Sequence, residues 1–164
     1  MSAVSTRLRE QWRLRDQVYQ VGEEANEGRV SPRKLAAHAL HSAMAFTGAT
    51  AGAIALVTTR QVRLIAREGL SAPSGAQLPS EFAGSCEVSR VFSGETVVLN
   101  PRSDHDTSPS ILAVPLRACG KVVGALIIAK PGIVFVEERR ALTVMAACIG
   151  PRLVRKAGKR GRCP

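Results

Sequence analysis

Two apolar segments separated by a short turn constrain the fold of this chain more than any other feature. They cover residues 110–116 and 121–129, and the turn residues 118–120 between them include a glycine. Runs of this length, bounded by turn residues, are typical of buried strands. The second run is enclosed by Lys121 and Lys130, so it is far shorter than the roughly 20 apolar residues of a membrane-spanning helix. The pair predicts a hairpin at the centre of an antiparallel sheet.

Helical patterns lie on both sides of this predicted hairpin. Ser31 followed by Pro32 is typical of a helix start, and Gly48 is typical of its end. Residues 137–154 have a second helical pattern, in which Pro151 must kink the helix or mark its end. The apolar face of the first helix consists of Leu35, Ala36, Ala39, Leu40, Ala43 and Met44, and the second helix carries the apolar residues Leu142, Val144, Met145, Ile149 and Leu153.

Shorter elements fill the chain between the two helices. Strands are predicted over residues 51–57, 61–67 and 96–99, a short helix over 85–92, and loops over 71–79 and 100–108. Gly94 is expected to end the short helix in a left-handed conformation. Gly124 lies inside an apolar strand, which predicts a close approach by another backbone or side chain.

The composition agrees with one domain that has a single core. The chain has 164 residues, and apolar residues make up 45% of it but aromatic residues only 4%. A chain of this length buries well over half of the surface that its unfolded form exposes. The core must therefore consist mainly of Val, Leu, Ile and Ala, which is typical of a compact α/β (α+β) domain.

The formal net charge of +10 is concentrated at the C-terminal end. Residues 152–164 contain six basic side chains and no acidic one, which leaves +4 for the rest of the chain. We treat residues 155–164 as a basic flexible tail. Such a tail predicts at most weak, non-specific contact with nucleic acid. The alternative interpretation is a solvated end that increases solubility.

Residues 1–30 form a separate N-terminal segment, in which an amphipathic helix is predicted. Its apolar stripe has alternating spacings of four and three, at Leu14, Val18, Val21 and Ala25. A stripe of this kind needs a partner surface, and we expect it to form the interface of a homodimer together with the C-terminal helix. The start of the chain lacks the apolar core of a secretory signal, so we expect a cytoplasmic protein.

An ordered set of short motifs between residues 83 and 130 resembles the GAF family. The set comprises a glycine-containing loop at 83–85, a Gly-Glu turn at 94–95, Ser110 followed by Pro115 and Leu116, and a Val-Gly-Ala-Leu segment at 123–126. The resemblance covers residues 31–154. It implies a central antiparallel sheet flanked by the N- and C-terminal helices on one side and by the short helix and loops on the other.

The resemblance also implies a ligand site, because GAF domains hold ligands between the sheet and the segment that here covers residues 82–110. The implied apolar wall consists of Phe82, Cys86, Val91, Phe92 and Leu99, and the polar candidates are Asn100, Asp104, His105, Ser108 and Ser110. Such a site suits a small planar or amphipathic molecule. The alternative is that these apolar residues fill the core and that the loop is solvated. The sequence identifies no cofactor.

Binding of cyclic nucleotides is not expected. Members of the family that bind them have an Asn-Lys pair, then a Phe, then an acidic pair. Lys130 and Phe135 are present here, but Ala129 replaces the Asn, and Arg139 and Arg140 replace the acidic pair. We therefore expect that Lys130 cannot form the corresponding ion pair.

A thiol enzyme is the less favoured alternative. Free methionine sulfoxide reductases are also GAF-like, and Cys86 lies near one of their cysteine positions. Residues 101–110 contain no second cysteine, so a disulfide-based cycle lacks its second step. The four cysteines have no zinc-ligand spacing, and no metal site is predicted.

We therefore expect a non-catalytic regulatory module. It would bind a small molecule or a partner protein in a signalling pathway and signal through dimerisation. A dimerisation or protein-interaction module without a ligand remains the main alternative.

Overall fold

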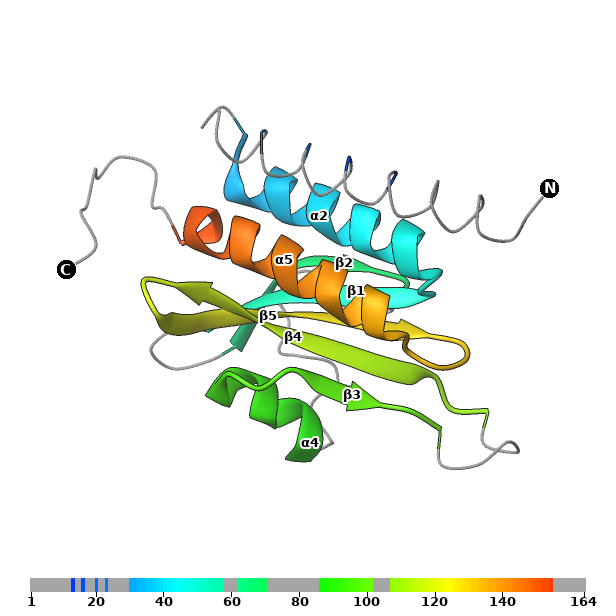
Figure 1. The fold of residues 1–164 in the computed structure, drawn as a ribbon. Coiled ribbons are helices and arrows are strands. Elements are labelled where there is room, and N and C mark those ends of the chain that lie inside the picture. Colours follow the sequence, from blue (N-terminus) through cyan, green and yellow to red (C-terminus); the bar gives the residue numbers. More distant parts are fainter. Residues whose placement is uncertain are drawn as a thin grey trace.

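The computed structural model describes residues 30–57, 62–70, 86–101 and 107–154, together with Arg13, Asp16, Gln20 and Glu23. The elements in chain order are α2 (Pro32–Thr47), β1 (Ala51–Val57), β2 (Val62–Glu68), α4 (Cys86–Ser89), the 3-10 helix η1 (Arg90–Ser93), β3 (Val97–Leu99), β4 (Ser110–Ala118), β5 (Lys121–Lys130) and α5 (Val136–Leu153). Figure 1 shows α2 and α5 on one face of the sheet and α4 on the other. This arrangement confirms the predicted fold class.

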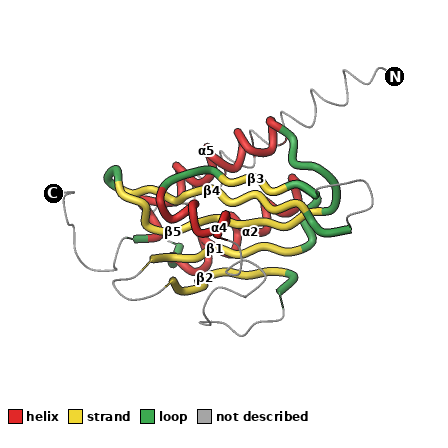
Figure 2. Tube along the Cα trace, turned by 90° about the horizontal axis from the view of Figure 1, so that it is seen from below, coloured by secondary structure: helices red, strands yellow, loops and turns green. Residues whose placement is uncertain are grey.

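The sheet has five antiparallel strands in the order β2-β1-β5-β4-β3 (Figure 2). The predicted hairpin is β4 and β5, and β5 is the central strand. Its turn residues Cys119 and Gly120 both have a positive φ, of 51° and 75°. Two such residues form the type I′ turn whose twist matches that of the strands it joins.

Helix α2 begins and ends where its sequence signals predict. The Ser31 hydroxyl accepts a hydrogen bond from the Lys34 backbone N–H at 3.4 Å, and Pro32 occupies the first turn. Gly48 ends the helix with a φ of 66°, and its N–H donates to the Met44 carbonyl. All six residues of the predicted apolar face are buried.

Helix α5 contains all five apolar residues that were predicted to lie on it. Leu142, Met145, Ile149 and Leu153 are buried, whereas Val144 is 53% exposed. The buried positions follow one another at spacings of three and four, and Val144 falls outside that stripe. Pro151 lies in the last turn of the helix.

The two faces of the sheet are packed against different layers. The helix side carries the larger core, to which the strands contribute Ile54, Leu112, Val114, Leu116, Leu126 and Ile128 and the helices contribute the faces described above. The second face carries Ala53, Ala55, Leu64, Ala113, Ala125, Ile127 and Ala129. Among the described residues, nine of the ten largest fully buried side chains belong to the helix side, and the exception is Ile127.

Two glycines allow close contacts between backbones, one between neighbouring strands of the sheet and one between α5 and β4. A Cβ atom at Gly124 would lie 2.1 Å from the carbonyl oxygen of Ala55, which confirms the close approach predicted for this position. A Cβ atom at Gly150 would lie 2.4 Å from the carbonyl oxygen of Arg117. Gly150 therefore lets α5 pack directly on the end of β4.

The N-terminal segment is described at four positions. Arg13, Asp16, Gln20 and Glu23 are helical and exposed, whereas the predicted stripe of Leu14, Val18, Val21 and Ala25 lies outside the described residues. The basic tail from residue 155 also lies outside them. None of the helices in the described part of the chain has the length and apolar character needed to span a membrane.

Candidate functional site

The second face of the sheet is a floor of small side chains. The strand registers place Arg67, Ala53, Ile127, Ala113 and Val97 in one row that crosses all five strands. Residues directly opposite one another on neighbouring strands share a face of the sheet. Ala53, Ile127 and Ala113 are fully buried. The row therefore runs from a guanidinium at one edge, over an apolar floor, to β3 at the other edge.

Part of the predicted ligand-binding wall meets on this face. Val91 is fully buried, and Phe92 and Leu99 are partly buried against the same cluster. The side chains of Val91 and Phe92 come from η1, which Gly94 ends in a left-handed conformation with a φ of 99°. The sequence thus predicted a set of residues that the structure brings together.

Other predicted site residues cannot be placed on this face. Phe82, Asp104 and His105 lie outside the described residues. Cys86 is the first residue of α4, and its side chain is not among those described. Ser108 is exposed in the segment that precedes β4.

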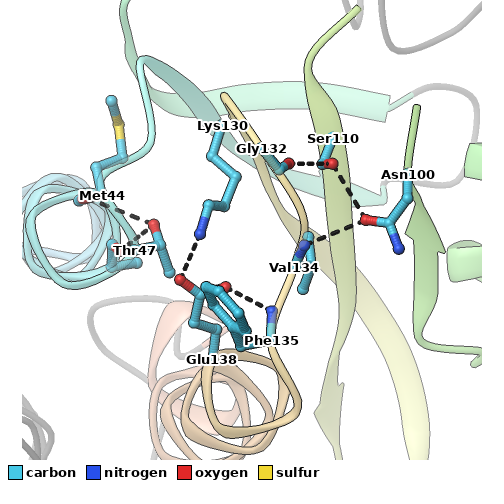
Figure 3. Close-up of polar contacts among 10 residues, drawn as sticks. Met44, Thr47, Asn100, Ser110, Lys130, Gly132, Val134, Phe135 and Glu138 are labelled. Carbon is cyan, nitrogen blue, oxygen red and sulfur yellow. Dashed lines mark hydrogen bonds and ion pairs between the residues drawn. The ribbon is translucent and has the colours of Figure 1, made fainter. Parts of the chain in front are cut away.

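Asn100 and Ser110 meet at a different place, the junction between β3, β4 and the segment before α5 (Figure 3). The Asn100 Oδ1 atom accepts from the Ser110 hydroxyl at 3.1 Å and from the Val134 backbone N–H at 3.2 Å. The Gly132 carbonyl is a second acceptor for the single Ser110 hydroxyl proton. The fully buried Ser110 alternates with Ile111, so it does not share the second face. These contacts hold strand ends together.

Lys130 has an ion-pair partner at a position that the sequence analysis did not consider. Its Nζ atom lies 2.5 Å from Glu138 Oε1, and the two side chains are only 7% and 10% exposed. The expectation concerned an acidic partner at position 139 or 140, and this partner lies at neither position. The carboxylate belongs to Glu138, one position before Arg139. Glu138 lies in the first turn of α5, which directs its side chain back to the end of β5. Glu138 Oε2 also accepts the Phe135 N–H at 2.8 Å, and Lys130 Nζ lies 5.1 Å from the centre of the Phe135 ring.

Arg67 was not predicted as a site residue. Its Nη1 atom is buried and has no hydrogen-bond acceptor among the described residues. Strict alternation along β2 would place Arg67 on the opposite face from Leu64. An irregularity between Ile54 and Ala55 shifts the register, so that Ala55 pairs with Leu64 and Ala53 pairs with Arg67. Arg67 therefore shares the second face with Leu64.

The described residues offer no metal centre: no group of three or more His, Cys, Asp or Glu side chains among them is placed to hold a metal ion. The chemistry available on the second face is an apolar floor, an apolar cover and one buried cationic donor. Small-molecule sites in proteins combine these two features, an apolar lining and a few directed polar groups.

The comparison with protein families identifies the class. The sequence model of the GAF domain family matches residues 31–150, so the chain belongs to the GAF domain family. GAF domains are typically regulatory or sensory modules, and the fold gives no positive evidence of catalysis. No curated protein sequence matches the chain significantly.

Solved structures of other GAF domains share this fold. The GAF domain from an Acinetobacter phosphoenolpyruvate-protein phosphotransferase superposes with a TM-score of 0.68 at 20% identity, covering 93% of this chain and 94% of that one. The free methionine-R-sulfoxide reductase from Neisseria meningitidis, in complex with its substrate, gives 0.67 at 21% identity, with 85% and 87% covered. The second GAF domain of DevS from Mycobacterium smegmatis gives 0.58 at 16% identity, with 75% and 93% covered. These similarities establish the fold alone.

Proposed function

We propose that this GAF domain is a non-catalytic cytoplasmic sensor that holds a small molecule on the second face of its sheet and passes the signal to another polypeptide. The observation that carries the proposal is the difference in side-chain size between the faces. The second face consists mainly of alanines, whereas the helix side holds almost all of the large buried side chains. Because small side chains do not fill the space above the strands, that space is filled by the covering segments or by a ligand.

The described cover of this floor is slight. It consists of α4 and η1, each only four residues long, and of side chains at the strand ends. Val91 and Phe92 anchor η1 to the floor. Because the alanines are buried in this structure, a ligand must take the place of part of the cover. Short helices with few buried side chains are the elements that open at the lowest free-energy cost.

Native mass spectrometry of the freshly purified full chain tests this proposal. The expected result is an adduct of a small molecule that denaturation removes. Ala113→Val adds volume to the floor and is expected to lower the occupancy, whereas Ala118→Val makes the same change at the end of the same strand and is expected to leave it unchanged. If the adduct is equally abundant in both variants, the ligand does not lie on the second face.

A second function, dimerisation, is favoured by the outer surface of α5. Val144, Ala147, Cys148 and Pro151 are all exposed, and their spacing of three, one and three places them on one stripe of the helix. An apolar stripe on an outer helix is suited to a second copy of the chain. We infer that this stripe and the N-terminal stripe of Leu14, Val18, Val21 and Ala25 form the homodimer interface.

Light scattering of the full chain tests the dimer. Val144→Glu and Val18→Glu are each expected to give monomers, and Thr143→Glu, a charge added at the neighbouring exposed position, is expected to leave the dimer intact. A wild-type chain that stays monomeric at high micromolar concentration would remove dimerisation from the proposal and leave the ligand site as it is.

A further inference from the structure

We propose that Arg67 binds the acidic group of the ligand and that the ligand is a small monocarboxylic acid with an apolar body. This inference rests on the proposed ligand site and adds the chemical class of the molecule. Among the described residues, Arg67 is the one charged side chain with a buried donor that lacks an acceptor.

The position of Arg67 on the second face follows from the strand register. Arg67 pairs with Ala53, and Ala53 pairs on its other side with Ile127. Ala53 belongs to the core cluster with Leu64, and Ile127 to the cluster that contains Val91. A molecule lying along this row would place its acidic end at β2 and its apolar end beneath η1. Neighbouring strands are about 4.8 Å apart, so Arg67 and Ile127, which lie two strands apart, are separated by about 10 Å along the row, a length that an extended body of roughly eight carbon atoms spans.

A buried guanidinium nitrogen without an acceptor is unusual in a folded protein. Almost all buried polar groups have hydrogen-bond partners, and a guanidinium cannot lose its proton to escape the cost. The Nη1 atom of Arg67 has no acceptor within the described residues. A bound oxyanion supplies both the missing acceptor and the compensating charge.

Three other described cations are already paired. Arg117, which lies at the far end of β4, donates to the Gly94 carbonyl at 2.9 Å. Arg90 pairs with Glu95, and Lys130 pairs with Glu138. Arg67 therefore offers a single positive charge and, at Nη1, a buried donor that no described acceptor satisfies. These match a carboxylate, whereas a phosphate dianion requires further cations or donors to offset its second charge.

Matched acids and amides test the inference on the full chain. The probes are phenylacetate and octanoate, each compared with its neutral primary amide, and inorganic phosphate serves as a separate arm. Wild-type protein is expected to bind each acid at least tenfold more tightly than its amide, measured by calorimetry. Loss of one charge-assisted hydrogen bond in Arg67→Met is expected to weaken acid binding by about 10- to 100-fold and to remove the preference over the amide. The matched control, Arg63→Met, changes an exposed arginine of the same strand and is expected to retain it.

The ligand-free protein gives a second measurement that needs no probe. If Nη1 lacks an acceptor, Arg67→Met removes an unsatisfied donor while it retains most of the side-chain volume. The unfolding midpoint of Arg67→Met is then expected to equal or exceed that of wild type. A clear fall, relative to Arg63→Met, would show that Arg67 has an internal partner and would overturn the inference.

The remaining outcomes separate this inference from the proposed site. If wild type binds acids and amides equally and Ala113→Val weakens both, the floor is a ligand site but Arg67 does not select an acid. If Ala113→Val weakens neither, the proposed site itself is wrong. If wild type binds none of the acids, or binds phosphate in their place, the assignment of a monocarboxylic acid is overturned.

Discussion

The two faces of the sheet share the same strands but are covered in different ways. On the helix side, α2 and α5 are 16 and 18 residues long and pack large side chains against the strands. On the second face, the described cover is two four-residue helices over a floor of alanines. Leu126 and Ile127 are consecutive and fully buried in β5, yet they belong to different faces. The two side chains are thus equally buried but packed against different layers. The helix side, with its long helices and large side chains, is the part that stabilises the domain.

The largest expected effect comes from the ion pair that closes the helix side at the end of β5. Glu138→Leu leaves Lys130 buried without its carboxylate, and such losses reduce stability by about 3–5 kcal/mol. Urea unfolding followed by circular dichroism measures the change. The double variant Lys130→Met/Glu138→Leu replaces the pair by apolar groups of similar size and is expected to regain most of the loss. A single variant that loses less than the double variant would contradict a buried, paired Lys130.

The next prediction compares the faces directly at Leu126 and Ile127. Leu126→Ala is expected to lower the free energy of unfolding by about 2–5 kcal/mol and to lie near the upper end of that range, because α2 and α5 cannot close a cavity between them and the sheet. Ile127→Ala is expected to lie near the lower end, since η1 can settle onto the floor. Unfolding of both variants under the same conditions gives the comparison. Equal losses would mean that the two covers are equally rigid.

Much of the helix side was predictable from the sequence. Ser31, Pro32 and Gly48 mark the ends of α2, and apolar spacing identifies the buried faces of both long helices. These signals are local, so a single chain shows them. The exposure of Val144 was not predictable, because an apolar residue next to the stripe carries no local sign that it faces outward.

The second face was predictable only in part. The resemblance led to Val91, Phe92 and Leu99, which the structure brings together. Arg67 could not be found, because the irregularity between Ile54 and Ala55 reverses the face of every later residue in β2 and leaves no sequence signal. The partner of Lys130 was missed for a related reason. The first turn of α5 brings the Glu138 carboxylate to the end of β5, and the spacing of residues in the sequence does not show this.

A smaller effect is expected from the close contact between α5 and β4. Gly150→Ala adds a Cβ atom 2.4 Å from the Arg117 carbonyl oxygen, so the helix must move outward or bend. Overpacking of this kind costs about 1–3 kcal/mol, which thermal unfolding detects. Arg139→Ala, at an exposed position of the same helix outside the proposed interface stripe, is the control, and a change within about 0.5 kcal/mol is expected there. A Gly150→Ala variant as stable as wild type would mean that α5 can shift away from the end of β4 at little cost.

The smallest expected effect distinguishes a structural role of Asn100 from a ligand role. Asn100→Ala removes the acceptor that serves the Ser110 hydroxyl and the Val134 N–H. Its expected loss of stability is about 0.5–1.5 kcal/mol. Asn100→Asp keeps an acceptor oxygen at the same place, so its stability is expected to remain close to that of wild type.

The same two variants are then tested for ligand binding. Because the described contacts of Asn100 lie at the strand junction and not over the alanine floor, neither change is expected to alter the affinity for an acid that binds the second face. Calorimetry on wild type, Asn100→Ala and Asn100→Asp measures this. Suppose that Asn100→Ala weakens binding while its unfolding midpoint stays unchanged. The junction would then belong to the ligand site, and the separation between a stabilising helix side and a binding second face would not hold at this end of the sheet.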